Sequence, residues 1–199
     1  PIMTFTMKKL LISTILISTL SMNGCMKYPS LSDEQRPNNW GTLISNTHNF
    51  YQISQDVYRS EQPDAELIAS LKQHQIHTVI NLRARNKDAN VFKDQDFNLV
   101  HIPIYTWAIN RDDLLTAMRA IQTAKQQNQK VLVHCYHGSD RTGATIAMYR
   151  IIFENWSIED AVKEMKQGGY GYHVIWKNIE HLFTTDNVKW IQQQLSNPS

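Results

Sequence analysis

The chain has 199 residues, of which 42% are hydrophobic and 19% are charged, a balance that suits one folded domain and excludes a disordered or collagen-like chain. The formal net charge is only +2, and Lys and Arg are dispersed along the chain, so the charge pattern does not favour nucleic-acid binding. The two cysteines, Cys25 and Cys135, lie far apart, which argues against a disulfide framework and against a zinc cluster.

Residues 1–25 have the parts of a secretory signal peptide. A basic start at Met7 precedes an apolar run over residues 10–20, which is too short to span a bilayer comfortably, and a small residue, Gly24, closes the segment. The alternative is a buried amino-terminal helix, but the positive flank argues against it. We therefore leave this segment out of the predicted fold.

The end of the same segment, Gly24-Cys25, resembles a bacterial lipoprotein signal, in which the cysteine is lipidated. Met22 and Asn23 depart from the usual leucine and small residue of such signals. The resemblance implies an exported protein, either periplasmic or anchored to a membrane through Cys25. We expect no membrane contact apart from this anchor, and we predict no oligomeric state.

The next 24 residues, 26–49, contain prolines and asparagines without a clear period, and we expect a linker or surface arm there. The folded domain is expected to cover residues 50–199. Its first strand is predicted at Val57–Ser60. A helix opening at Pro63 and Asp64 follows, because apolar residues recur at helical spacing after it.

The middle of the chain alternates strands and loops. Residues 78–82 are apolar on both faces, as in a central parallel strand, and residues 99–104 form another strand. The polar residues 86–96 between them are predicted to be a loop. Asp112 or Asp113 is expected to cap the next helix, which carries one apolar stripe.

The last part of the chain is mostly helical after one more strand. We predict a buried strand at Lys130–His134 and an apolar helix over residues 142–154. A capping box at residues 157–160 begins a further helix that Gly168 ends, and one or two helices follow His173. This alternation predicts an α/β fold, with helices on both faces of a central, mainly parallel sheet.

The candidate catalytic residues lie where the last predicted strand ends. There the sequence reads His134-Cys-Tyr-His-Gly-Ser-Asp-Arg-Thr-Gly143. Five residues separate Cys135 from Arg141, enough to bend the backbone into a cup whose N–H groups point inward and bind a phosphate dianion at the start of a helix. The same field would keep Cys135 a nucleophilic thiolate at neutral pH. The residues expected to bind phosphate are Tyr136, His137, Gly138, Ser139, Asp140 and Arg141.

The flanking side chains have separate expected roles. Arg141 supplies a planar, permanently charged fork that can hold two phosphoryl oxygens. Gly138 keeps the loop free of a Cβ atom, and Gly143 lets the following helix pack closely. The hydroxyl of Thr142 is expected to donate to the sulfur of Cys135.

This segment resembles the cysteine-dependent protein tyrosine phosphatase superfamily, in its small dual-specificity-like branch and most of all its bacterial periplasmic tyrosine phosphatases. The likeness extends through Tyr58-Arg-Ser-Glu-Gln62, Val79-Ile-Asn-Leu-Arg83 and Gly168-Gly-Tyr-Gly-Tyr-His173. The resemblance implies a two-step reaction through a cysteinyl phosphate, without a metal or another cofactor.

The resemblance also implies a general acid, usually an aspartate upstream of the cysteine. Asp112 is slightly favoured, and Asp113 and Asp140 remain alternatives. The expected substrate is a phosphorylated protein, above all one carrying phosphotyrosine, or a small phosphomonoester. The competing hypotheses are an inositol-phosphate phosphatase with the same chemistry and a non-catalytic phosphate-binding module.

Overall fold

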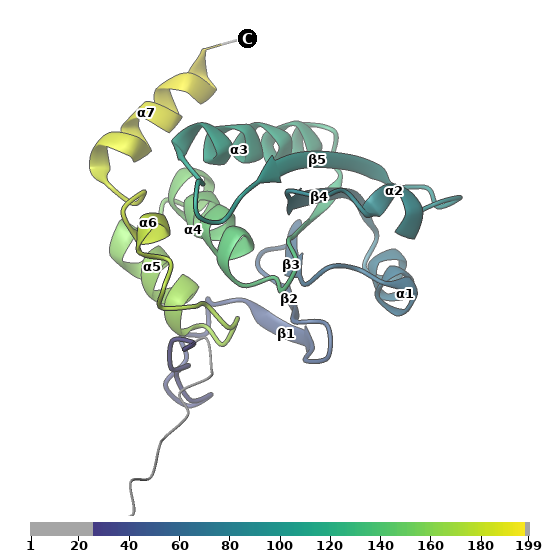
Figure 1. The fold of residues 1–199 in the computed structure, drawn as a ribbon, viewed down its shortest axis with the longest axis horizontal. Coiled ribbons are helices and arrows are strands. Elements are labelled where there is room, and N and C mark those ends of the chain that lie inside the picture. The colour runs from purple at the N-terminus through teal and green to yellow at the C-terminus, as the bar shows by residue number, and fades with distance from the viewer. Residues whose placement is uncertain (1–25, 198–199) are drawn as a thin grey trace, which may run out of the picture.

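A computed structural model describes residues 26–197, which form one six-stranded sheet between two layers of helices (Figure 1). The strands are β1 (Thr42–Ser45), β2 (Phe50–Gln52), β3 (Val57–Ser60), β4 (Ile76–Arg83), β5 (Asn98–Ile104) and β6 (Lys130–His134). Their order across the sheet is β1-β2-β3-β6-β4-β5. The predicted signal peptide and its lipidation residue, Cys25, lie outside the described residues.

The sheet is parallel where the candidate site forms. Strands β3, β6, β4 and β5 pair in parallel, whereas β1 and β2 add an antiparallel edge beside β3. Strand β6 lies between β3 and β4, and its last four residues are buried, as the apolar sequence of the strand predicts. The prediction of a mainly parallel α/β sheet is confirmed.

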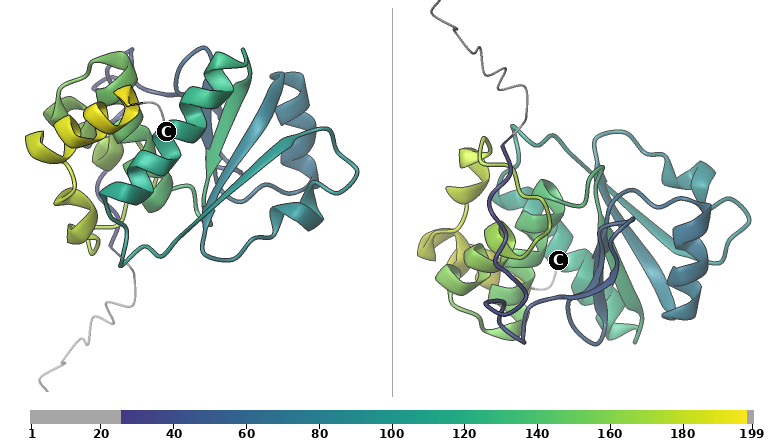
Figure 2. Two further views of the ribbon diagram at one scale, coloured as in Figure 1. Left: turned by 90° about the horizontal axis from the view of Figure 1, so that it is seen from above. Right: turned by 90° about the horizontal axis from the view of Figure 1, so that it is seen from below.

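Helices cover both faces of the sheet, as Figure 2 shows. One face is covered by α1 (Ala65–Gln73) and α2 (Asp88–Val91), and the other by α3 (Arg111–Gln126), α4 (Asp140–Glu154) and α5 (Ile158–Gln167), followed by α6 (Lys177–Glu180) and α7 (Thr185–Ser196). Each layer buries its own apolar cluster against the sheet. Within the described part of the chain, no helix has the length and hydrophobicity needed to cross a bilayer.

Residues 26–49, where we expect a linker or surface arm, pack in part against the rest of the domain. Strand β1 belongs to the sheet, and the side chain of Trp40 is 5% exposed. The N–H of Gly41 donates to Oε1 of Glu164 at 2.8 Å, and the Arg36 guanidinium donates to the carbonyls of Gly41 and Gly168. These individual contacts have no sequence period, so the composition of the segment did not reveal them.

Two local predictions also need correction. Helix α2 lies within the predicted loop 86–96, and it buries Asp88. Helix α3 is capped by Asn110, whose Oδ1 accepts from the N–H groups of Asp112 and Asp113 at 2.8 and 3.2 Å. The carboxylate of Asp113 accepts in return from the N–H of Asn110 at 2.9 Å, which completes a capping box whose N-cap lies two or three residues earlier than expected.

Candidate active site

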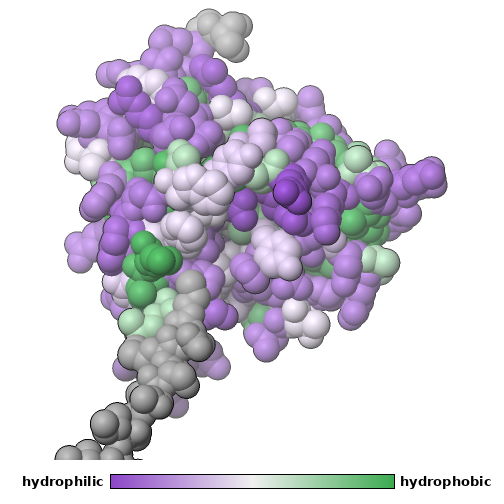
Figure 3. Space-filling model, in the orientation of Figure 1, coloured by the Kyte–Doolittle hydropathy of each residue, from purple (hydrophilic) through white to green (hydrophobic). Residues whose placement is uncertain are grey.

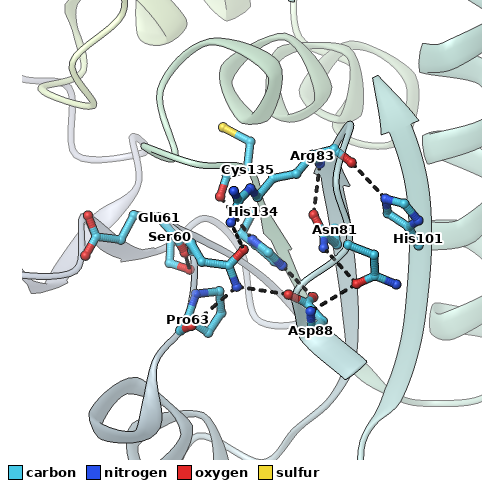
Figure 4. A network of polar contacts seen from close by, with 11 residues as sticks. Ser60, Glu61, Pro63, Asn81, Arg83, Asp88, His101, His134 and Cys135 are labelled. Atoms are coloured by element: carbon cyan, nitrogen blue, oxygen red, sulfur yellow. Dashed lines mark hydrogen bonds and ion pairs between the residues drawn. The ribbon is translucent and has the colours of Figure 1, made fainter. Parts of the chain in front are cut away.

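The candidate site lies at the junction of β6 and α4, at the carboxyl edge of the parallel strands. Cys135 directly follows β6 and is 2% exposed. Figure 4 shows its sulfur pointing away from the buried pair of Asp88 and His134. Residues 135–141, here called the 135–141 loop, connect the strand to the first turn of α4, which is where open α/β sheets bind ligands.

The carbonyl groups of the 135–141 loop are held from outside. Those of residues 135–139 each accept a hydrogen bond, from His134 Nδ1 (3.1 Å), Gln62 N (3.0 Å), Asn49 Nδ2 (2.9 Å), Arg59 Nη2 (2.6 Å) and Gly143 N (2.9 Å), respectively. Donors from β6, from β3, from the residues before β2 and after β3, and from α4 therefore fix five consecutive peptide units. In a trans peptide unit the N–H group points away from the carbonyl group. Because the carbonyls are bound on the outside, the N–H groups point towards the inside of the loop.

The N–H groups of the same loop are free. Those of residues 136–141 donate to no other group among residues 26–197. Residues 140 and 141 begin α4, where the first N–H groups have no partner within the helix. A set of unpaired N–H groups at a helix start is an anion-binding arrangement.

Gly138 permits this conformation. Its φ angle is +69°, and a Cβ atom built on it would lie 2.4 Å from the carbonyl oxygen of Ser60. The loop thus passes against the end of β3 at a distance that only glycine allows. At Gly143, an added Cβ would lie 3.1 Å from Cγ of Met165, so this glycine brings α4 close to α5 as expected.

Arg141 lies across the ends of two strands. Its Nη1 donates to the carbonyls of Ile104 (2.9 Å) and Leu82 (3.3 Å), at the ends of β5 and β4. Its Nε is buried and has no partner among the described residues, and Nη2 makes no hydrogen bond with them either. Nε and Nη2 form the edge of a guanidinium that binds two oxygens of one phosphoryl group. Nη1 of Arg141 is therefore bound by the strand ends, while the edge formed by Nε and Nη2 is free to bind a phosphoryl group.

A buried ion pair lies beneath Cys135 (Figure 4). Nε2 of His134 is 2.8 Å from Oδ2 of Asp88, and Nδ1 of the same ring faces the carbonyl of Cys135. The ring thus lies between two acceptors, a carbonyl oxygen and a carboxylate oxygen. His134 therefore connects the carbonyl of Cys135 to the carboxylate of Asp88 and orients the loop.

The ionisation of Asp88 follows from its partners. Burial alone would raise the pKa of Asp88, but the hydrogen bond and charge of His134, a hydrogen bond from Gln62 and the charge of Arg83 outweigh it and lower the pKa. Gln62 Nε2 donates to Oδ1 of Asp88 at 2.9 Å, and Nη1 of Arg83 donates to Oε1 of Gln62 at 2.7 Å. The network keeps the carboxylate charged at neutral pH.

The three candidate acids lie in different surroundings. Asp112 is exposed on the first turn of α3, and its carboxylate makes no hydrogen bond with the described residues. Asp113 closes the capping box, and burial raises its pKa. Both carboxylate oxygens of Asp140 accept from His173, one from its N–H and one from Nδ1, each at 2.9 Å. Asp112 is thus the candidate whose carboxylate is not already engaged.

The predicted bond between Thr142 and the cysteine is absent. Oγ1 of Thr142 is buried and has no partner among residues 26–197. Position 142 lies inside the first turn of α4, where the threonine is fully buried. Its hydroxyl therefore does not support the sulfur in this structure.

The surroundings of the loop are polar with a few exposed aromatic rings. Figure 3 shows a largely hydrophilic face. Tyr136, Tyr105 and Trp107 are each more than half exposed, and the rings of the last two lie 4.9 Å apart. A cavity of about 290 Å³ adjoins the loop at His137 and Ser139. Among the described residues, no cluster of three or more His, Cys, Asp or Glu side chains could hold a metal ion.

Sequence reasoning missed two buried charged residues of this site, Asp88 and Arg59. Asp88 lies in a polar stretch that resembles a surface loop, so no local signal marks its burial. Arg59 lies in a segment that carries the family resemblance, yet only its position on β3, next to β6, reveals its contact with Gly138.

Comparisons with known proteins agree with this geometry. The family model "Dual specificity phosphatase, catalytic domain" matches residues 57–184. The dual specificity protein phosphatase TpbA from Pseudomonas aeruginosa strain UCBPP-PA14 is 32% identical over 132 residues, which make up 66% of this chain and 60% of that protein. The match thus spans less than two thirds of the relative's length.

Two further relatives bear on the ligand. A crystal structure of P. aeruginosa TpbA, as a cysteine-to-serine variant in complex with phosphotyrosine, is 26% identical with a TM-score of 0.75, and the match covers 82% of this chain and 99% of that one. Inositol diphosphatase DSP5 from Arabidopsis thaliana is 23% identical over 139 residues, 65% of this chain and 66% of that protein. Because the family model covers more than half of the chain, including the whole 135–141 loop, this protein belongs to the dual specificity phosphatase catalytic-domain family.

Proposed function

We propose that this protein is a cysteine-dependent phosphatase that hydrolyses phosphate monoesters, chiefly phosphotyrosine in proteins. One observation carries the proposal: the free N–H groups of the 135–141 loop and the free edge of Arg141 surround the position directly after β6, where Cys135 lies. A dianionic phosphoryl group satisfies both sets of donors at once.

The reaction follows from these groups. The thiolate of Cys135 attacks phosphorus, and a P–S bond forms while the P–O bond to the leaving group breaks. Asp112 gives its proton to the departing oxygen. A water molecule then attacks phosphorus and gives a proton back to Asp112, while the P–S bond breaks, which restores the thiolate and releases inorganic phosphate. The loop N–H groups and Arg141 stabilise the charge on the equatorial oxygens in both steps.

An aryl phosphate suits the surroundings of the loop. Tyr136 directly follows the nucleophile and is 52% exposed, and Tyr105 and Trp107 follow β5, where Arg141 is held. Exposed aromatic rings favour contact with a phenyl ring over contact with a small aliphatic phosphate. The phosphotyrosine complex of TpbA supports the same substrate class.

The test is hydrolysis of phosphotyrosine peptides by the chain from residue 26 onward, in the presence of a chelator. We expect turnover without added metal. Cys135→Ser should abolish turnover while binding persists, and Arg141→Lys should lower kcat about a hundredfold or more, because lysine cannot hold two oxygens in one plane. Activity that requires a metal, or an active serine variant, would contradict the proposal.

Inositol phosphates are the second candidate substrates, because one relative is named an inositol diphosphatase. The cavity beside the loop contains Lys27, His137 and His173, which could attract further anionic groups, although Glu61 also lines it. Parallel kcat/KM measurements on phosphotyrosine peptides and inositol phosphates separate the two. We expect the peptides to be favoured, and a larger value for inositol phosphates would reverse the assignment.

We further propose that the protein is exported and carries lipid at Cys25. The support is the basic and apolar pattern of residues 1–25 and the Gly24-Cys25 pair. Expression of the full chain in a bacterium, with labelling by a fatty acid, should place the label on the wild type but not on Cys25→Ala. Equal labelling of both chains, or no export of either, would contradict this part.

A further inference from the structure

Arg59 is a buried cation directly beneath the 135–141 loop. It lies on β3, its side chain is 0% exposed, and its Nη2 donates to the carbonyl of Gly138 at 2.6 Å and more weakly to that of Ser139 at 3.4 Å. The carbon of the guanidinium lies 3.8 Å from the centre of the Tyr170 ring. Nε and Nη1 are buried and make no hydrogen bond with the described residues.

This cation has no carboxylate partner within residues 26–197. The nearby buried acid, Glu164, is already bound to Arg150 through both carboxylate oxygens, at 2.8 and 2.9 Å. Burial lowers the pKa of Arg59, while Tyr170, Glu164 and Cys135 act in the opposite direction. An arginine remains charged even so, and a buried charge is costly unless an anion lies near it.

The donors of Arg59 and the free N–H groups of the loop belong to the same peptide units. A hydrogen bond to the carbonyl of Gly138 aligns the dipole of the peptide between residues 138 and 139, so that the N–H of Ser139 points to the opposite side. Of the five donors that hold carbonyls 135–139, Arg59 is the one that carries a permanent charge, and it has no carboxylate partner within the described residues. Arg59 is therefore the uncompensated positive charge of the set.

We propose that Arg59 is a positioning residue whose counter-ion is the thiolate of Cys135 or, after binding, the phosphoryl group. Arg59 acts through the loop and does not touch the substrate. It fixes the carbonyls of Gly138 and Ser139 outward and favours the ionised sulfur on the inner side. The inference rests on the proposed role of Cys135 as nucleophile.

Alkylation of Cys135 by iodoacetamide tests this directly, because it reports the thiolate without any turnover. In the chain from residue 26 onward, Cys135 is the one cysteine. Three substitutions separate charge from hydrogen bonding: Arg59→Gln keeps a donor but no charge, Arg59→Met keeps neither, and Arg59→Lys keeps the charge. Circular dichroism checks that each variant is folded, and the Gln variant serves where the Met variant does not fold.

At about pH 6 we expect Arg59→Gln and Arg59→Met to alkylate about tenfold more slowly than the wild type, and Arg59→Lys to stay within about threefold. The rates should converge at alkaline pH, where every variant has an ionised thiol. A merely structural role would change the rates equally at all pH values. The matched control is Arg119→Met, since Arg119 also donates to a backbone carbonyl, that of Gln194, but far from the loop.

A folded Arg59→Gln variant that alkylates like the wild type at about pH 6 would overturn the inference, as would a rate deficit that persists unchanged at alkaline pH. Hydrolysis of an aryl phosphate is measured on the same samples. Slow alkylation of the variants together with an inactive wild type would leave the role of Arg59 intact and refute the proposed phosphatase activity.

Discussion

At the residue scale, the peptide groups of the 135–141 loop form the anion-binding part of the site. Five consecutive carbonyls are bound on the outer side, and the N–H groups that follow them are free on the inner side. The side chain of Arg141 is likewise bound on one side and free on the other. Its Nη1 donates to carbonyls at the ends of β4 and β5, while Nε and Nη2 have no partner in the described chain. Donors fixed before the ligand arrives need little reorganisation during the reaction.

The general acid can be identified by substitution. Asp112→Asn should lower kcat for phosphotyrosine about a hundredfold, because the tyrosyl oxygen is a poor leaving group without a proton. The loss should be much smaller for an aryl phosphate whose phenol is already a good leaving group. Asp113→Asn is the matched control, since that carboxylate caps α3. If the control lost the leaving-group-dependent activity and Asp112→Asn did not, the assignment would pass to Asp113.

Gly138 gives a second prediction at this scale. Gly138→Ala should destabilise the fold by about 3 kcal/mol, since the new methyl group meets the carbonyl of Ser60 and the residue keeps a positive φ angle. Denaturant unfolding measures the loss, and phosphate binding should fall as well. A variant with unchanged stability would show that the loop does not pass so close to β3.

At the element scale, the loop is positioned by four strands and one helix. Strand β6 delivers Cys135, β3 delivers Arg59, the ends of β4 and β5 hold Arg141, and the start of α4 supplies free N–H groups. Helix α5 joins these elements to the amino-terminal segment through Glu164, which binds Arg150 of α4, the N–H of Gly41 and the hydroxyl of Tyr170.

Glu164 should therefore be important for stability. Glu164→Ala leaves Arg150 without its buried partner and frees the Gly41 N–H, so we expect a loss of about 3–5 kcal/mol in the free energy of unfolding. Glu154→Ala removes the other, more exposed partner of the same arginine and should cost less than about 1 kcal/mol. Equal losses in the two variants would refute the special role of Glu164.

The sequence could predict the elements whose pattern is local. Strand β6 has an apolar centre, Val131–Val133, and α5 follows a serine that accepts from the N–H of Asp160, and the sequence predicts both elements. The motif around Cys135 predicts the position of the loop at the end of β6, with Arg141 and Gly138 in it. The packing of residues 26–41, helix α2 and the burial of Asp88 and Arg59 depend on partners far along the chain, which no local pattern specifies.

At the scale of the whole molecule, two helical layers bury a sheet whose polar site is supported by buried ionisable side chains. His134, Asp88 and Arg59 are each at most 2% exposed. Such groups are stable only in the ionisation states that their partners favour. The stability of the whole domain should therefore depend on pH through the site.

Asp88 sets the direction of that dependence. Its pKa is lower in the folded state than the ordinary value of 3.8, so its contribution is complete above 3.8 and is lost as the pH falls through the lowered value. Denaturant unfolding of the wild type and of Asp88→Asn should differ most at about pH 7 and converge in acid. A difference that stays constant between these conditions would show that Asp88 is not held as a carboxylate by His134.

The central claim is that the free N–H groups of the 135–141 loop bind the phosphoryl group next to Cys135. A crystal structure of Cys135→Ser with phosphotyrosine tests it most directly. We predict phosphoryl oxygens about 2.7–3.2 Å from the N–H groups of residues 136–141 and from Nε and Nη2 of Arg141. A phosphoryl group bound elsewhere, with those N–H groups and the free edge of Arg141 still unpaired, would contradict the claim.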